Sequence, residues 1–190
     1  GSGGAPSNQV RHAQPMPTDP RTGEVVRAPP DDFDGEPEFA SAGPFQTYRI
    51  DITNADSPRA HEKKTPQWVR ARGRISGAGG RRAHLAALAY VSDSYFIGTI
   101  SRIHRLWRFP FPVRDVRALP PDTAAHVRQL NDWEGLGEVE GFEDRPEIGM
   151  MVSLDHTIYF HEPDRVKADE WMFTEMESPW AGDGRGVVYQ

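Results

Sequence analysis

The sequence predicts an α+β domain in which an antiparallel sheet wraps around one buried helix. Residues 67–75 alternate between apolar and arginine side chains, which is typical of a half-buried strand. Residues 82–96 are apolar on nearly every side of a helix, which is typical of a buried helix. Several short strand-like segments follow, and no internal repeat is visible. One long helix followed by several antiparallel strands is an α+β pattern.

The composition fits one packed domain with tails and excludes several kinds of chemistry. The chain has 190 residues, of which 37% are hydrophobic and 26% are charged. It contains no cysteine, which excludes disulfides, thiol nucleophiles, thiolate zinc sites and iron–sulfur clusters. No apolar run reaches the roughly 18 residues that a transmembrane helix needs, so we expect no membrane span.

Charge is distributed unevenly along the chain, although the net charge is only −6. Residues 60–117 carry 12 Lys and Arg against 3 Asp and Glu, and residues 131–190 carry 4 against 15. A basic block of this kind either meets a phosphate-bearing partner or pairs with the acidic block of the same chain. The charge pattern leaves both interpretations open.

We expect residues 1–44 to form an arm or linker and residues 45–190 to form the domain. The first 44 residues contain 8 Pro and 6 Gly and few large apolar side chains. Such a segment buries too little apolar surface to offset the entropy lost on ordering. Phe33 is an aromatic side chain by which the arm could dock on the domain.

Local patterns predict the first elements of the domain in chain order. Residues 45–52 predict a first strand, and Val69 and Ile75 mark the apolar face of the second. A glycine-rich break at 77–80 separates that strand from the helix.

The middle of the chain predicts an insertion at about 109–148. Prolines at positions 110, 112, 120 and 121 interrupt the chain after the helix. Residues 122–130 predict a short surface helix, and the acidic residues 134–147 are typical of a surface loop. A loop this long is uncommon inside a compact domain, so we expect it on the surface.

Strand patterns return near the C-terminus. Residues 151–161 alternate between apolar and polar side chains, and residues 170–177 predict a further strand. Residues 179–184 predict a turn, and residues 186–189 predict the start of a strand that the chain end cuts off.

Asp93 and Ser153 are the candidate catalytic residues. Asp93 lies within the apolar helix, where a carboxylate is costly unless it is paired or hydrogen-bonded. Burial would tune this carboxylate toward use as a general base; a structural carboxylate with a local partner is the alternative. Ser153 lies on the polar face of the strand at 151–161, where its hydroxyl either orients a water, acts as a nucleophile or is an ordinary strand serine.

Two further patterns do not predict a site. Asp155 and His156 are adjacent in a predicted strand and therefore point to opposite faces, as do His156 and His161, so we expect no metal site. The glycine-rich residues 182–186 lack the helix and the Lys-Ser/Thr ending of a phosphate loop, which favours a hairpin turn.

Three segments together are similar to one known family. They are 68–75 (WVRARGRI), 84–96 (HLAALAYVSDSYF) and 152–161 (VSLDHTIYFH), and 169–186 follows in the expected order. From residue 67 onward the chain resembles the C-terminal half of acyl-CoA thioesterase II, a double hotdog enzyme, and its insertion resembles the fungal version. The resemblance implies a hotdog fold, an antiparallel sheet wrapped around a long central helix. It also implies hydrolysis of fatty acyl-CoA to free fatty acid and CoA, with no cofactor other than the CoA of the substrate.

The resemblance implies roles for both candidate residues. The family's catalytic set is an aspartate on the central helix, a Thr or Ser hydroxyl on the next strand and a glutamine on the last strand. The first two map onto Asp93 and Ser153, which are expected to orient and deprotonate a water that attacks the thioester carbonyl, while a backbone N–H stabilises the oxyanion. The last strand with its glutamine is missing from this sequence, and Gln190 stands too early to be that residue.

The N-terminal hotdog of the family is also missing from this sequence. We therefore expect a second hotdog domain, from the same protein or another chain, and an oligomer, because an isolated half leaves an exposed sheet edge. The family is often peroxisomal, so we expect an intracellular location, peroxisomal or cytosolic.

Five arginines are candidates for binding the CoA phosphates, because guanidinium forks suit phosphate oxygens; solvated surface charge is the alternative. They are Arg70, Arg72, Arg74, Arg81 and Arg82. The alternative function is a non-catalytic hotdog module that binds acyl groups or assembles with a partner chain. A nucleic-acid-binding module is disfavoured, because the aromatic residues lie on apolar faces and not among the arginines.

Overall fold

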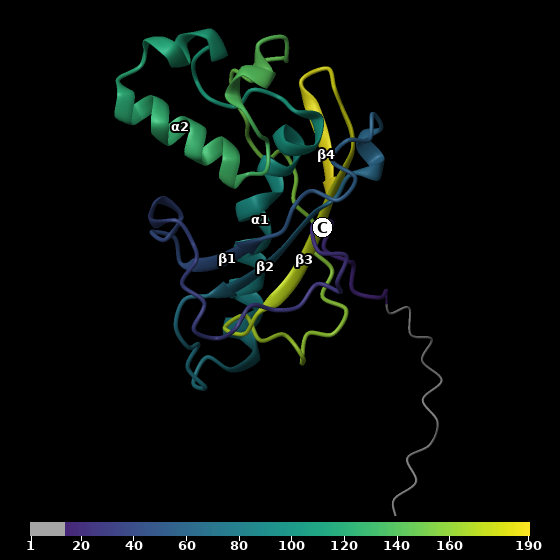
Figure 1. The fold of residues 1–190 in the computed structure, drawn as a ribbon. Helices are drawn as coiled ribbons and strands as arrows, with labels where there is room; N and C mark the ends of the chain where they lie inside the picture. The colour runs from purple at the N-terminus through teal and green to yellow at the C-terminus, as the bar shows by residue number, and fades with distance from the viewer. Residues whose placement is uncertain (1–13) are drawn as a thin grey trace, which may run out of the picture.

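A four-stranded antiparallel sheet packed against one long helix organises the chain (Figure 1). The structure, a computed structural model, describes residues 14–190. In the described residues the strands lie in the order β1-β2-β3-β4, and the helix α1 packs on one face of the sheet. The elements are β1 (Phe45–Arg49), β2 (Thr65–Ala71), α1 (Gly80–His104), α2 (Pro121–Trp133), β3 (Met172–Gly182) and β4 (Arg185–Tyr189).

The strand pairing explains why the alternating segments form a sheet. β2 pairs with the first half of β3, and β4 pairs with the second half of β3, so the long strand β3 connects the two parts of the sheet. Val69 of β2 lies opposite Met172 of β3 and is buried with Phe45 of β1 and Val91 of α1. The predicted strands at 45–52, 67–75, 170–177 and 186–189 are confirmed with shifted ends.

The helix α1 is longer than predicted and is not buried on all sides. It runs for 25 residues and ends where Arg105 adopts a left-handed conformation (φ 52°). Val91 and Ile103 are buried, whereas Tyr90 is 60% exposed. The prediction of a helix buried all round is therefore wrong for this chain, because the sheet covers only one side of α1.

The predicted strand at 151–161 is absent. These residues form an irregular segment that lies along α1, held by contacts of Ser153 and His156 with the helix. A strand needs a neighbour to take its backbone hydrogen bonds, and no described strand pairs with this segment. Its apolar residues Leu154 and Tyr159 are consequently 79% and 77% exposed.

The hairpin at the C-terminus turns later than predicted. Residues 179–182, which belong to the predicted turn, continue β3. The chain reverses at Asp183 and Gly184, whose φ angles of 50° and 70° suit the two-residue hairpin turn that an Asp-Gly pair favours. The hairpin interpretation of residues 182–186 is confirmed.

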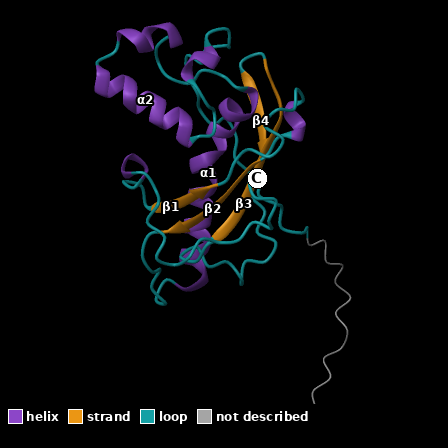
Figure 2. Cartoon of the chain, viewed as in Figure 1, coloured by secondary structure: helices purple, strands orange, loops and turns teal. Residues whose placement is uncertain are grey.

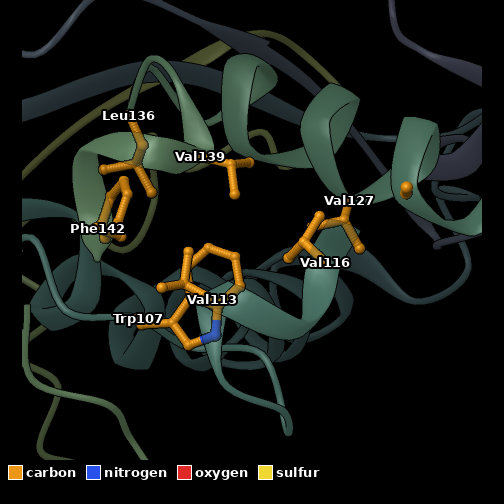
Figure 3. Close-up of a cluster of buried hydrophobic side chains, with 8 residues drawn as sticks. Trp107, Val113, Val116, Val127, Leu136, Val139 and Phe142 are labelled. Carbon is orange, nitrogen blue, oxygen red and sulfur yellow. The ribbon is translucent and has the colours of Figure 1, made fainter. Parts of the chain in front are cut away.

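The insertion after α1 has a hydrophobic core of its own (Figure 3). The predicted short helix is present as α2, and two short 3-10 helices, Val113–Ala118 and Val139–Phe142, complete the region. The buried side chains are Trp107, Val113, Val116, Ala124, Val127, Leu136, Val139 and Phe142. The acidic stretch that suggested a plain surface loop therefore carries three of the residues that close this core.

The arm docks on the domain through aromatic side chains. Phe33 packs edge to face against Tyr48, at 5.2 Å between ring centroids, and against Trp171, at 6.1 Å. Further along, Phe39 packs against Trp133 of α2 at 5.5 Å. Phe33 thus docks as expected, and the domain boundary at residue 44 stays a prediction.

Outside the sheet and the two α-helices the described chain is mostly loop and short helix (Figure 2). Within residues 14–190, none of the helices combines the length and apolarity that crossing a membrane requires.

Candidate active site

The structure brings Asp93 and Ser153 together. The Ser153 hydroxyl donates a hydrogen bond to Oδ1 of Asp93, with 3.1 Å between the oxygens. Asp93 comes from the middle of α1, and Ser153 comes from the irregular segment at 151–161. The two residues are therefore in contact, as a shared role on one water requires, although the predicted strand is absent; the catalytic roles stay predictions.

Both residues of this pair lie at the surface of the described chain. The predicted burial of Asp93 is wrong, because α1 turns Val91 into the sheet core and leaves Asp93 and Ser94 on the exposed side. The case for Asp93 as a base consequently rests on its contact with the Ser153 hydroxyl and not on burial.

His156 lies beside this pair, and sequence reasoning missed it. Its Nε2 is 3.2 Å from Oγ of Ser92, and its ring centroid is 5.7 Å from that of Phe96. Because the Ser92 hydroxyl donates to the Ala89 carbonyl, the Nε2–H of His156 is the donor in this bond. The assumption of a regular strand hid this residue: in the irregular segment, Ser153 and His156 both reach α1.

The pair can hold and deprotonate a water. A carboxylate fixed by a hydroxyl is a proton acceptor, and the exposed position leaves room for a water molecule. Across residues 14–190, no cluster of three or more His, Asp or Glu side chains is placed to hold a metal ion.

Two of the five candidate arginines bind the arm. Nε of Arg70 donates to Gln46 Oε1 at 2.9 Å and Nη2 donates to the Asp31 carbonyl at 2.7 Å. Arg72 donates to the Gly43 carbonyl at 2.9 Å and pairs with Glu36. For these two residues the structure supports internal pairing.

The other three arginines lie near the start of α1. Arg74, Arg81 and Arg82 are exposed, and Arg81 pairs with Asp164 in the segment before β3. The five arginines therefore do not share one set of contacts, and phosphate binding by these three stays a prediction.

Gln190 does not join the Asp93–Ser153 contact in this structure. Its Nε2 donates to Oγ1 of Thr174 on β3 at 2.9 Å. This hydrogen bond gives no reason to assign Gln190 the role of the family's glutamine.

An antiparallel sheet packed on one long helix is the α+β arrangement of a hotdog domain, and the Asp93–Ser153 contact lies on the exposed side of that helix. A family model described as "Acyl-CoA thioesterase C-terminal domain" matches residues 17–190. The chain therefore belongs to the acyl-CoA thioesterase C-terminal domain family.

Curated relatives agree with this assignment. The chain is similar to acyl-coenzyme A thioesterase 8 of Homo sapiens and of Rattus norvegicus, each 36% identical over 128 residues, which is 67% of this chain and 27% of the relative. The Mus musculus protein of the same name is 35% identical over 131 residues, which is 69% of this chain and 28% of the relative. The chain thus spans about a quarter of the length of these relatives. No solved structure matches it significantly.

Proposed function

We propose that this chain is the C-terminal hotdog of an enzyme that hydrolyses fatty acyl-CoA to free fatty acid and CoA. The observation that carries the proposal is the hydrogen bond between Ser153 and Asp93, in a chain of the acyl-CoA thioesterase C-terminal domain family. The names of the three curated relatives support the same activity.

In the proposed reaction Asp93 is the general base and Ser153 positions the water. The carboxylate takes a proton from a water that attacks the thioester carbonyl, and a backbone N–H stabilises the negative charge on the carbonyl oxygen. The thioester C–S bond then breaks, and CoA leaves as the thiol after taking up a proton. We propose that the reaction needs no resident cofactor, because the CoA belongs to the substrate.

The test is hydrolysis of a series of acyl-CoA substrates by the complete protein that contains this chain. Released CoA is measured with a thiol reagent, to which this chain adds no background because it has no cysteine. Saturable hydrolysis supports the proposal. Binding of acyl-CoA without hydrolysis would instead favour the non-catalytic hotdog module.

We expect Arg74, Arg81 and Arg82 to contribute to binding of the CoA phosphates. Changing each to Gln should raise the KM for acyl-CoA by up to about fivefold per arginine, the range of an exposed charge pair. The effect should shrink at high salt, because exposed charges are screened. Arg117→Gln, at an exposed position in the insertion, is the control. An unchanged KM in the triple variant would leave the three arginines as plain surface charge.

We also propose that a second hotdog domain, from the same protein or another chain, covers the exposed side of α1. Tyr90 on α1 and Leu154 and Tyr159 beside it are 60%, 79% and 77% exposed, next to the Asp93–Ser153 pair. Exposed apolar surface of this kind is typical of an interface. Leu154→Glu in the complete protein should weaken that association, measured by light scattering and by hydrogen exchange along α1. Exchange on α1 as in wild type, with an unchanged mass, would contradict the proposal.

We propose an intracellular location for the complete enzyme, in the peroxisome or the cytosol. The resemblance to a family that is often peroxisomal supports this proposal. Imaging of the tagged complete protein tests it, and secretion would contradict it.

A further inference from the structure

Three arginines gather around one carboxylate on the side of α1 away from Asp93. Arg49 ends β1, Arg102 lies in the last turn of α1, Arg108 follows α1, and Glu134 directly follows α2. Arg102 is nine residues after Asp93, which is two and a half helical turns and therefore the opposite side of the helix. Figure 1 shows the end of α2 approaching α1 in this region, and Nε of Arg102 donates to the Glu134 carbonyl at 3.0 Å.

The single carboxylate does not balance these three charges. Oε1 of Glu134 is 3.7 Å from Nη2 of Arg49 and 3.4 Å from Nη2 of Arg108, both beyond the usual hydrogen-bond distance. Arg102 is only 4% exposed, and the Arg49 side chain is 12% exposed. Among these four side chains the positive charges outnumber the negative charge by two, and they are largely buried, which is unfavourable without further counter-charge.

Burial and mutual repulsion both act on this cluster. Burial, together with the nearby positive charge of Arg49, lowers the pKa of Arg102 to about 9. Burial likewise lowers the pKa of Arg49. A bound anion would relieve both effects.

Several buried polar atoms of the cluster have no hydrogen-bond partner. Three buried donors have no partner in the described residues: Nε of Arg49, and Nε and Nη2 of Arg108. One buried acceptor, Oε2 of Glu134, also has none, and both amide atoms of Gln67, which lies opposite Arg49 in the sheet, are without a partner. Residues 1–13 contain no Asp or Glu and therefore cannot supply a carboxylate side chain.

A cavity of about 280 Å³ opens onto two of the three arginines. Arg49, Arg102 and Trp133 line it, and the Arg49 guanidinium lies 4.0 Å from the centre of the Trp133 ring. This volume is small for a binding site and suits a small anion or one end of a larger molecule.

Three carboxylates also line this cavity, namely those of Glu36, Asp51 and Asp132. Two of them are already paired with arginines: Glu36 pairs with Arg72, and Asp51 pairs with Arg21, which also lines the cavity. Glu36 also accepts a hydrogen bond from the backbone N–H of Thr47. Asp132 is therefore the lining carboxylate that competes most directly with a bound anion.

We propose that this cavity binds an anion with phosphate or carboxylate oxygens. Arg49 and Arg102 face the ligand, and Arg108 and Glu134 hold them in place. Guanidinium forks match the paired oxygens of both kinds of anion. The proposal goes beyond the proposed function and does not depend on it, because the cavity and Asp93 lie on opposite sides of α1.

The test measures anion binding by the complete protein at constant ionic strength, adjusted with sodium chloride. Inorganic phosphate and acetate are titrated separately by calorimetry, which distinguishes a phosphate site from a carboxylate site. We expect saturable binding of at least one of them. Arg49→Gln should weaken it by about 10- to 100-fold, as expected for loss of a hydrogen bond to a charged group.

Two further variants keep the test decisive. Asp132→Asn removes a competing negative charge from the cavity wall and should tighten binding severalfold, even if Arg49→Gln folds poorly. Arg117→Gln, which is exposed and outside the cluster, should bind as wild type does. Absence of saturable binding of both anions, or equal binding by wild type and Asp132→Asn, would overturn the proposal.

Discussion

Asp93→Asn is expected to lower kcat for acyl-CoA hydrolysis in the complete enzyme by about 10²–10⁴-fold, the usual contribution of a general base. The asparagine keeps the shape of the side chain and still accepts the hydrogen bond from Ser153, which is 3.1 Å long in the native chain. What it loses is the ability to take a proton from water. The measurement is steady-state hydrolysis by wild type and variant, with folding checked by circular dichroism.

Ser153→Ala should lower the rate by less, about tenfold, because it removes one hydrogen bond to the carboxylate and leaves the base in place. Ser94→Ala, an exposed serine next to Asp93 on α1, is the matched control and should behave as wild type. If Asp93→Asn folds normally and keeps nearly full activity, Asp93 is a structural carboxylate and the catalytic assignment fails.

Side-chain alternation predicted the sheet because its strands find partners within the chain. β2 pairs with β1 on one side and β3 on the other, so its pattern and its structure agree. Residues 151–161 show the same alternation, yet they lie along α1 without strand pairing. Alternation reports which side chains prefer burial, and it cannot report whether a neighbouring strand is available.

The candidate pair was predictable, but its surroundings were not. The family resemblance placed Asp93 and Ser153 in one site, and the structure joins them by a hydrogen bond. The apolar composition of α1 suggested burial on every side, but it does not specify how much of the helix one sheet covers. His156 was missed for a related reason, because regular strand geometry would have turned it away from Ser153.

No pattern in the sequence predicted the arginine cluster. Arg49, Arg102 and Glu134 are far apart in the chain and meet only when β1, α1 and α2 converge. The core of the insertion was hidden in the same way, because prolines interrupt any periodicity between Trp107 and Phe142 and the acidic residues near Phe142 suggest a loop.

Trp107→Ala is expected to destabilise the insertion by about 3–5 kcal/mol, the usual cost of removing a large aromatic side chain from a core. Trp107 is 1% exposed and packs against Phe109 and Phe142, at 4.9 and 5.8 Å between ring centroids (Figure 3 shows Trp107 and Phe142). Its indole N–H donates to the Phe111 carbonyl. Its backbone also bonds both Pro146 and Ile148, at 2.9 and 2.8 Å, so Trp107 joins the two ends of the insertion.

The destabilisation by Trp107→Ala should be measured by chemical denaturation together with hydrogen exchange of the amides of α2. Loss of the Trp107 core should speed exchange in α2 while the amides of β2, in the separate sheet core, keep their protection. Trp107→Phe keeps most of the apolar contact but loses the indole hydrogen bond, so it should cost about 1–2 kcal/mol. Trp180→Ala, at a position 48% exposed on β3, is the control and should change stability by less than about 1 kcal/mol. Equal stability of Trp107→Ala and Trp180→Ala would show that the insertion does not depend on this core.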